Sequence, residues 1–289
     1  MKMAEEQLVL CEKKGYIGYI IINRPDKMNG INRATYAALA DACDYFEAED
    51  DIKVVVIKGA GRCFSAGFDL STTVGKETNE TQRRAYEAYG NRTRKKIWEM
   101  TKPTIAQVHS YCYGGAHDIA LACDFCIVSD DASMGVNEIQ FGQGATFLAM
   151  PYMINLRKCR EYLLTGKFYD GKTAVEIGIA NQCVVCDPEN KYDAKTQPEL
   201  KHQELDEAVK AFAKELAKVP RNAMALQKKA INRCVDAMGF ATMREQWLDT
   251  LCLGMCWEDE EVNEFNAKLK ELGSLKKAKQ WREEKYANI

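Results

Sequence analysis

Two short runs of β-branched residues, GYIGYIIINR at 15–24 and KVVVIKG at 53–59, constrain the fold of this chain most strongly. Each has the length and the composition of a single strand. Between them, residues 33–50 carry apolar side chains at helical spacing. Two further apolar runs, at 103–111 and 125–130, read as buried strands. Strands that alternate with helices at this spacing predict a parallel sheet covered by helices, and therefore an α/β fold.

The β signal fades from about residue 145, and a helical pattern replaces it. Its four windows are 145–166, 204–219, 221–238 and 240–257. The residues after 257, rich in Lys and Glu, indicate amphipathic helix, whereas the polar stretch 186–204 is typical of a loop. We therefore expect an α/β core over residues 1–205 and a helical C-terminal region over residues 206–289.

The charge balance and the lengths of the apolar runs argue against nucleic acid and membranes as partners. The formal net charge is −2, with 40 basic and 42 acidic residues interspersed, which argues against nucleic acid as the main partner. No apolar run approaches the ~18 residues of a membrane helix. Residues 1–15 lack the apolar segment of a secretory signal. We expect a cytoplasmic protein that does not bind membranes.

The twelve cysteines include two pairs with CxxC spacing, Cys123 with Cys126 and Cys183 with Cys186. A zinc knuckle needs a tight turn that brings both thiolates to one side. Both pairs instead lie in β-rich runs, where residues three apart point to opposite faces. We therefore expect buried thiols in a reducing compartment, and no metal.

Two glycines stand where a strand-like run gives way to a helical pattern, in the segment VHSYCYGGAHDIALACD. Backbone N–H groups in the first turn of a helix have no intrahelical partner. Because glycine has no Cβ, a ligand atom could approach those donors closely at Gly114 and Gly115. The pattern therefore fits an oxyanion site, and it fits a tightly packed strand–helix turn equally well.

A second candidate donor loop, GRCFSAGFDL at 61–70, follows the strand KVVVIKG and contains Ser65, Ala66 and Gly67. Two such loops at the carboxyl ends of strands are what polarisation of a thioester carbonyl requires. Neither loop has a nucleotide-binding glycine pattern.

Two carboxylates are candidates for proton transfer. Asp118 lies one helical turn after Gly115, and Glu138 stands among apolar residues, an environment that raises a carboxyl pKa. Each also has a structural interpretation, Asp118 as a dipole partner in a first turn and Glu138 as a solvated or salt-bridged acid. His117 fits a packed or surface imidazole better than a base, because adjacent helix residues point about 100° apart. No nucleophile elbow or cysteine signature supports acyl-enzyme chemistry.

Five ordered segments together resemble the crotonase superfamily, the enoyl-CoA hydratase/isomerase family. FSAGFDL, KPTIAQVHSYCYGGAHDIALACD and MGVNEIQFG carry the resemblance at the site. NRPDKMNGIN at 23–32 is similar to the family's early substrate loop, and LLTGKFYDGKTAVEIGIANQCV at 163–184 to a later segment. The similarity extends from about residue 6 to about residue 240.

This resemblance implies a crotonase-like spiral of ββα units with a C-terminal α-helical trimerisation region, as a homotrimer or a dimer of trimers. It implies that the backbone N–H groups of Phe68 and Gly115 form an oxyanion hole, with Asp118 and Glu138 as the catalytic acid/base pair. It implies no metal and no cofactor other than the coenzyme A of the substrate. The residues it implies for substrate and coenzyme A binding are Lys27, Met28, Gly30, Ala66, Asp69 and Gly114.

The chain also departs from the family pattern. Asp118 replaces the glutamate that is usual in hydratases of linear enoyl-CoAs, and Thr146 stands where dienoyl-CoA isomerases carry a further aspartate. GQGATFLAMP at 142–151 differs from the usual hydratase segment. With the bulky Phe68 and the loop 71–80, these departures suggest a specialised pocket, for a ring-bearing acyl group among others. The C-terminal residues beyond the usual family end suggest a pocket cover or a trimer contact.

The function predicted from the sequence is hydration of an α,β-unsaturated acyl-CoA, a cyclic or otherwise specialised one included. The alternative is an enoyl- or dienoyl-CoA isomerase, or a ring-opening hydrolase of a CoA thioester. A non-catalytic RNA-binding relative is disfavoured, because both acids and both donor loops are present and basic residues are not clustered. The individual roles of Asp118 and Glu138 stay open at this stage.

Overall fold

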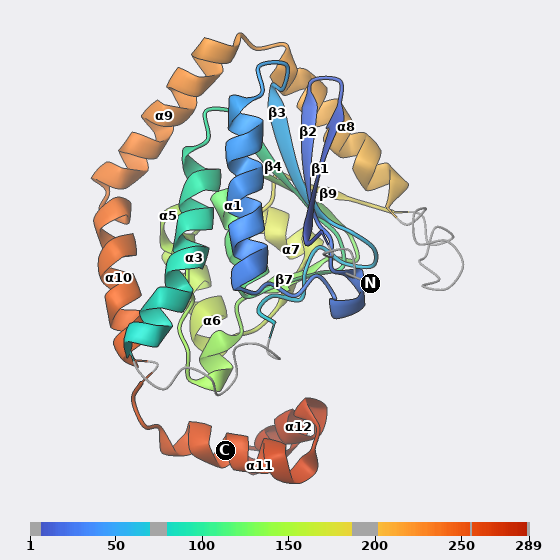
Figure 1. The fold of residues 1–289 in the computed structure, drawn as a ribbon. Helices are drawn as coiled ribbons and strands as arrows, with labels where there is room; N and C mark the ends of the chain where they lie inside the picture. The colour runs from blue at the N-terminus through green and yellow to red at the C-terminus, as the bar shows by residue number, and fades with distance from the viewer. Residues whose placement is uncertain (1–6, 70–79, 187–201, 255, 288–289) are drawn as a thin grey trace, which may run out of the picture.

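The computed structural model describes residues 7–69, 80–186, 202–254 and 256–287, and its strands form two sheets (Figure 1). The first sheet has six strands in the order β1-β2-β3-β4-β6-β9, and the second has three in the order β5-β7-β8. The strands are β1 (Val9–Lys14), β2 (Ile17–Ile22), β3 (Val54–Gly59), β4 (Thr104–Val108), β5 (Tyr111–Tyr113), β6 (Phe125–Ser129), β7 (Ser133–Gly135), β8 (Tyr169–Asp170) and β9 (Gln182–Val184).

The six-stranded sheet is parallel from β2 to β9, and only β1 pairs antiparallel with its neighbour. The parallel part confirms the sheet predicted from the alternating strand and helix patterns. The hairpin partner β1 was not predicted, because its sequence VLCEKK becomes polar after three residues.

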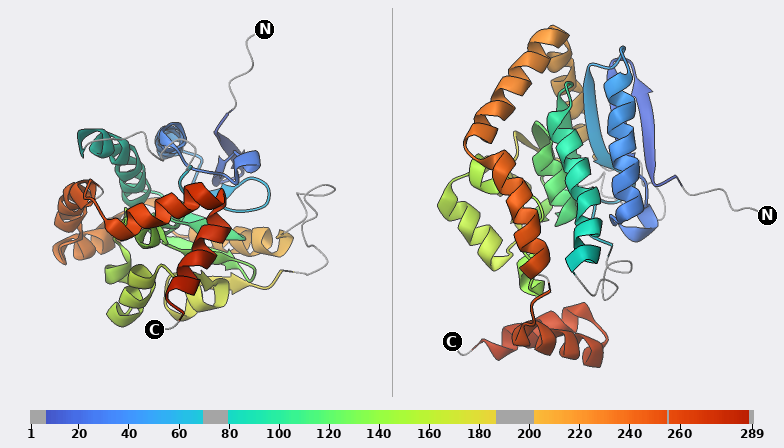
Figure 2. Two further views of the ribbon diagram at one scale, coloured as in Figure 1. Left: turned by 90° about the horizontal axis from the view of Figure 1, so that it is seen from below. Right: turned by 60° about the vertical axis from the view of Figure 1, so that its left-hand side comes forward.

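Helices cover both faces of this sheet. The α-helices are α1 (Arg33–Ala48), α3 (Glu80–Glu99), α4 (Gly115–Ala122), α5 (Met150–Met153), α6 (Leu156–Thr165), α7 (Gly171–Glu176), α8 (Gln203–Ala217), α9 (Arg221–Ala237), α10 (Phe240–Gly254), α11 (Glu260–Leu272) and α12 (Leu275–Lys285). Two short 3-10 helices are η1 (Pro25–Lys27) and η2 (Glu138–Phe141). Figure 2 shows α9 and α10 running along the side of α3, with α11 and α12 at one end of the molecule.

Burial on both faces explains why the strand β3 is continuously apolar. Val55 and Ile57 belong to the core cluster beneath α1, α3 and α4, whereas Val54 and Val56 belong to the cluster beneath α8. All four side chains have no exposed area. Burying a valine or isoleucine side chain stabilises the fold by about 1.5–3 kcal/mol. The four residues of β3 therefore stabilise the packing of helices on both faces of the sheet.

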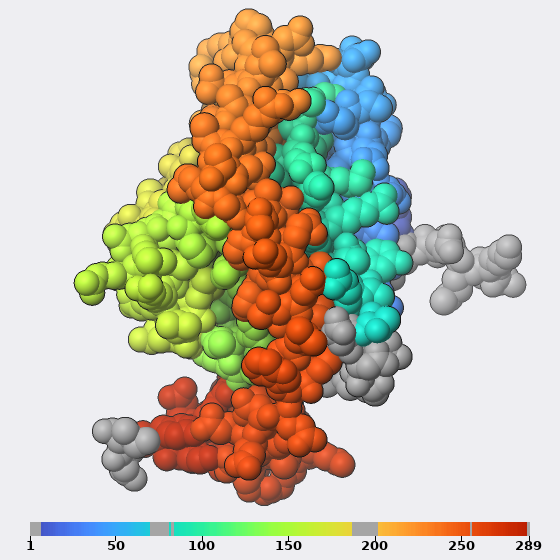
Figure 3. All heavy atoms as spheres, turned by 90° about the vertical axis from the view of Figure 1, so that its left-hand side faces the viewer, coloured from blue at the N-terminus to red at the C-terminus, as the bar shows by residue number. Residues whose placement is uncertain are grey.

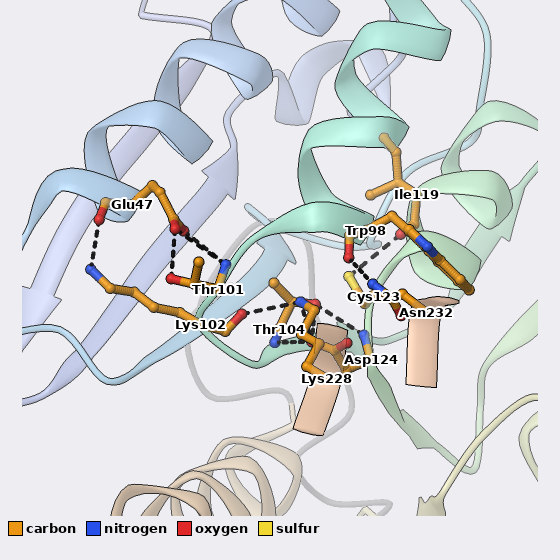
Figure 4. A network of polar contacts seen from close by, with 10 residues as sticks. All are labelled: Glu47, Trp98, Thr101, Lys102, Thr104, Ile119, Cys123, Asp124, Lys228 and Asn232. Carbon is orange, nitrogen blue, oxygen red and sulfur yellow. Dashed lines mark hydrogen bonds and ion pairs between the residues drawn. The ribbon is translucent and has the colours of Figure 1, made fainter. Parts of the chain in front are cut away.

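A partly buried polar network attaches α9 to the α/β core (Figure 4). The Nζ of Lys228 on α9 lies 2.7 Å from a carboxylate oxygen of Asp124, which also accepts hydrogen bonds from the backbone N–H and the hydroxyl of Thr104. Asn232, one turn further on α9, donates to the carbonyl of Trp98 at 2.8 Å. The helical region therefore joins the core by specific polar contacts as well as by apolar packing.

The two C-terminal helices contact the short helix η2. The ring of Phe265 on α11 packs edge-on against Phe141, with the ring centroids 5.8 Å apart. A Cβ on Gly142 would lie 2.5 Å from a methyl group of Val262, and Arg282 on α12 donates to the Gln140 carbonyl. The space-filling view shows the same helices against one end of the molecule (Figure 3). The far end of the chain thus supports the segment that begins with Glu138.

Several local predictions need correction. The window 145–166 is not one helix, because 145–149 are non-helical and α5 ends at Met153, before α6 begins at Leu156. The predicted loop 186–204 gives way to α8 at Gln203, and its residues 187–201 lie outside the described ranges. The helix α3 was not predicted, since its apolar residues are few among its charges. Cys123 caps the end of α4 and does not lie in a strand.

No helix in the described ranges is long and apolar enough to span a membrane.

Replacing Lys228 by methionine is expected to destabilise the protein by about 2 kcal/mol, because it removes a charged hydrogen bond that a buried ammonium makes to the partly exposed Asp124 carboxylate. Asp124 would keep the two Thr104 donors, which limits the loss. Urea unfolding followed by circular dichroism measures the change. Lys229→Met, on the exposed neighbouring position, is the matched control, and equal stability of the two variants would refute the role of the network.

Candidate active site

The loop that carries Phe68 is held in place by an isolated bridge to residue 31. The N–H of Ile31 donates to the Gly67 carbonyl at 2.8 Å, and the N–H of Asp69 donates to the Ile31 carbonyl at 2.9 Å. These two bonds are made by Gly67 and Asp69, the neighbours of Phe68. The N–H of Phe68 itself makes no hydrogen bond within the described part of the chain. The carboxylate of Asp69 pairs with Arg24 at 2.9 Å, which fixes the end of the loop.

Asn29 holds the other side of this loop. Its buried side chain donates to the carbonyls of Ala60 and Cys63, each at 2.8 Å, from a backbone with φ of 55°. The Ser65 hydroxyl donates to the Asn29 carbonyl at 2.7 Å and accepts from the N–H of Gly67 at 3.1 Å. These hydrogen bonds leave the loop little freedom, and a preorganised donor loop needs that rigidity.

The residues implied for coenzyme A binding lie beside this loop. Lys27 ends the helix η1 with an exposed side chain, and Met28 follows it in the left-handed conformation. The N–H of Gly30 donates to the Lys27 carbonyl, and the N–H of Ala66 donates to the Met28 carbonyl, both at 2.9 Å. The four residues are therefore neighbours in space. Asp69 differs from them, because its carboxylate is engaged by Arg24.

The turn that carries the glycine pair meets the 61–70 loop at Gly67. A Cβ on Gly67, whose φ is 90°, would overlap the carbonyl oxygen of Tyr113, the residue before the glycine pair. Gly115 begins α4, and its N–H makes no hydrogen bond within the described residues. A Cβ on Gly115 would lie 3.0 Å from the Phe68 ring. The structure therefore brings the two predicted donors, Phe68 and Gly115, to one place with both N–H groups available.

Glu138 is buried against the glycine pair. It is the first residue of η2, only 9% of it is exposed, and a Cβ on Gly114 would overlap its Oε1 atom. Its Oε2 atom is buried and has no hydrogen-bond partner among the described residues. Burial raises the pKa of Glu138 to about 8, and the negative charge of Asp118 contributes to that rise. At neutral pH this carboxyl is mostly protonated.

Asp118 faces the same place from the first turn of α4. It is 1% exposed, and its Oδ2 accepts a hydrogen bond from the Thr146 hydroxyl and lies 3.9 Å from Nη1 of Arg94. Its Oδ1 has no hydrogen-bond partner of normal geometry among the described residues. Burial raises the pKa of Asp118 to about 6, against the opposing effects of Arg94, of the Thr146 hydroxyl and of the Phe147 backbone N–H. Asp118 is therefore mostly ionised at neutral pH, while Glu138 is not.

Comparison with known proteins shows the family to which this chain belongs. The sequence model of the family described as enoyl-CoA hydratase/isomerase matches residues 12–251. The chain belongs to the enoyl-CoA hydratase/isomerase family. It is an enzyme of that family, as the sequence predicted.

A solved structure described as an enoyl-CoA hydratase/isomerase from Xanthobacter autotrophicus Py2 has a TM-score of 0.84 at 26% identity, covering 96% of this chain and 98% of that chain. A crotonyl-CoA hydratase of Syntrophomonas wolfei is 27% identical over 266 residues, 91% of this chain and 94% of that relative. A hydroxycinnamoyl-CoA hydratase-lyase of Pseudomonas fluorescens is 31% identical over 183 residues, 61% of this chain and 66% of that relative. These likenesses confirm the crotonase fold class.

The histidine beside Asp118 belongs to the core of this family member. The His117 side chain has no exposed area and its Nε2 hydrogen-bonds with the Tyr169 hydroxyl. Burial lowers its pKa to about 4, so the imidazole is neutral near pH 7. The packed interpretation of His117 is therefore correct.

Two site residues were missed from the sequence. Arg94 and Tyr36 are both fully buried near Asp118, and Nη1 of Arg94 donates to the Tyr36 hydroxyl at 3.3 Å. Arg94 is one of four arginines in α3, and the residue pattern of that helix does not single it out. The one local signal is Gly90, four residues earlier, where a Cβ would lie 2.7 Å from the Arg94 guanidinium.

The unusual segment 143–150 reaches the site through Thr146. The Trp247 indole donates to the Ala145 carbonyl at 2.7 Å and covers Gly144, so α10 holds this segment in place. Residues 70–79, which include most of the other predicted pocket loop, lie outside the described ranges. Within those ranges, no three His, Cys, Asp or Glu side chains gather as a metal site, and the twelve cysteines are free thiols.

Alanine at Gly114 is expected to lower kcat/KM by on the order of 100-fold, because its Cβ would displace the Glu138 carboxyl. The substitution also strains a backbone with φ of 51°. Gly15→Ala is the matched control, since Gly15 has φ of 61° and nothing within 4 Å of the added carbon. Turnover of an enoyl-CoA, with unfolding curves for both variants, separates the displaced carboxyl from simple loss of stability. Equal kcat/KM in the two variants would refute the predicted contact.

Proposed function

We propose that this enzyme adds water to an α,β-unsaturated acyl-CoA through an enolate held in an oxyanion hole. One observation carries the proposal: two buried carboxyls with different proton affinities lie beside two unpartnered backbone N–H groups. The names of the relatives support it, because a crotonyl-CoA hydratase and a hydroxycinnamoyl-CoA hydratase-lyase are both similar to this chain.

The donors suit the thioester oxygen. With the carbonyl oxygen between the N–H groups of Phe68 and Gly115, both donors would stabilise the negative charge that develops as water adds to Cβ. One such donor is worth about 10²–10³ in kcat. The start of α4 adds its dipole at the same place.

The pKa order supports different roles for the two acids. Asp118, mostly ionised near pH 7, takes a proton from the attacking water through its free Oδ1 atom. Glu138, mostly protonated, donates its proton to Cα of the enolate. The product gains the oxygen and one hydrogen of water at Cβ and one hydrogen at Cα. The proton on Asp118 then returns Glu138 to its acid form through solvent.

The remaining parts of the proposal concern binding and assembly. Coenzyme A would lie along Lys27, Met28, Gly30 and Ala66. The first three lie beside the 61–70 loop, and Ala66 belongs to it. Gly114 would let the Glu138 carboxyl lie close to the backbone at the start of α4, beside the acyl group. We further propose a homotrimer or a dimer of trimers in the cytoplasm, with no cofactor beyond the coenzyme A of the substrate.

Isomerisation of an enoyl- or dienoyl-CoA, or ring-opening hydrolysis, is the second candidate. The observations that favour it are Asp118, at the position where hydratases of linear enoyl-CoAs have glutamate, and the altered segment 143–150. Thr146 does not favour it, because dienoyl-CoA isomerases carry aspartate at that position. An ionised acid and a protonated acid on one enolate can also move a proton between two carbons.

Turnover in H₂¹⁸O distinguishes these reactions. Linear, dienoyl and cyclic enoyl-CoAs are each incubated with the enzyme and followed by mass spectrometry. We expect one ¹⁸O atom at Cβ with the thioester intact. Asp118→Asn and Glu138→Gln should each lose at least about 100-fold in rate, whereas the exposed Glu99→Gln should not. A product of unchanged mass with a moved double bond would establish an isomerase, and an opened ring would establish a hydrolase.

The pH dependence of kcat/KM is expected to be bell-shaped. Activity falls below pH about 6 as Asp118 gains a proton, and falls above pH about 8 as Glu138 loses one. Steady-state rates between pH 5 and 10 measure both limbs. A profile that keeps rising through pH 9 would contradict the assignment of Glu138 as the acid.

A further inference from the structure

Arg94 is the largest side chain in the described structure that is fully buried. A charged guanidinium without exposed area is costly unless a partner compensates it. It lies in α3, away from both donor loops in the sequence, and the mechanism proposed above assigns it no part.

The contacts of Arg94 converge on Asp118. Nη1 lies 3.9 Å from Oδ2 of Asp118 and donates to the Tyr36 hydroxyl, and Nη2 donates to the Thr146 carbonyl at 3.4 Å. The guanidinium lies 5.8 Å from the ring centroids of Tyr36 and Phe147. The Thr146 carbonyl thus accepts a hydrogen bond from Arg94, and the Thr146 hydroxyl donates one to Asp118.

These contacts are asymmetric at the carboxylate. Both the cation and the hydroxyl contact Oδ2, while Oδ1 is buried and has no hydrogen-bond partner of normal geometry among the described residues. The backbone N–H of Phe147 is a third, weaker influence that favours the charged carboxylate. A carboxylate held by one oxygen keeps the other for a substrate or a water molecule.

We propose that Arg94 is a positioning residue that fixes Asp118 through Oδ2 and keeps it ionised, so that Oδ1 faces the reacting water as a base. This inference rests on the proposed hydration. Arg94 acts through Asp118 and does not itself touch the reacting atoms.

The other ionisable groups near Asp118 oppose its ionisation or are neutral. Glu138 on η2 is a second acid, and Tyr36 on α1 and Cys112 on β5 have raised pKa values with burial as the main cause. Glu87 on α3 adds negative charge that raises the pKa of Glu138. Arg94 is the cation that lowers the pKa of Asp118 in the described structure. Without it, nothing of opposite charge there would offset the burial of Asp118.

The test compares Arg94→Met, which keeps most of the volume, with Arg94→Lys, which keeps the charge. The exposed Arg92→Met on the same helix is the matched control. An arginine beside an aspartate lowers its pKa by about 1–3 units, so Arg94→Met should move the acidic limb of kcat/KM upward by that amount. At pH 7 the loss should be about ten-fold, Arg94→Lys should restore part of it, and Arg92→Met should match the native enzyme. A loss that is uniform across pH, with the acidic limb unmoved, would overturn the proposal.

A second measurement works without turnover. Infrared titration of protein carrying ¹³C-labelled aspartate, with Asp118→Asn subtracted, reports the protonation of Asp118 directly. We expect its midpoint to rise in Arg94→Met and to return toward the native value in Arg94→Lys. Should Arg94→Met fail to fold, the Thr146→Val variant tests the same Oδ2 contacts, and it should show a smaller rise. An unchanged midpoint in the folded variants would overturn the role of Arg94, whereas an enzyme that hydrates no enoyl-CoA would overturn only the proposed function.

Discussion

One proton shared between two buried carboxyls is the constraint on which the rest of the site depends. Asp118 and Glu138 both lie out of water, and the charge of Asp118 raises the pKa of Glu138. A second negative charge at this place would be strongly unfavourable, so one acid remains protonated at neutral pH. Arg94 decides which one, because it lies beside Asp118. A single pair then supplies a base and an acid within one small volume.

Much of this fold follows from short-range patterns. Continuous apolar runs such as the one in β3 and helical spacing in α1 predict the elements, and the alternation of strands and helices predicts the parallel sheet. The glycine pair alone left a packed turn as an alternative, and Phe68 and Gly115 as donors came from the family resemblance. In the structure a Cβ at Gly114 or Gly115 would meet Glu138 or Phe68. The sequence could not predict which arginine of α3 is buried. That choice depends on packing against Tyr36 and Thr146, which are distant in the chain.

The environments of the two carboxyls also needed the structure. An aspartate in the first turn of a helix is commonly solvated, and a glutamate among apolar residues often finds a salt bridge. Here Asp118 instead meets the Thr146 hydroxyl and Glu138 packs on Gly114. The structure explains Thr146, which departs from the isomerase pattern, because its hydroxyl donates a hydrogen bond to Asp118. Such contacts join separate elements, and no local periodicity records them.

Glu138 depends on a different part of the chain from Asp118. Asp118 is held from α3 and the 143–150 segment, whereas η2 is held by α11 and α12 through Phe265 and Arg282. Asp118 and Glu138, the proposed base and acid, are therefore contacted by different helices. Sequence changes in the C-terminal helices would shift Glu138 relative to the fixed donor N–H groups, and changes in α3 would alter Asp118. A shared fold can in this way keep its donor loops while the positions of the two acids are adjusted from different helices, although their proton affinities stay coupled through the charge of Asp118.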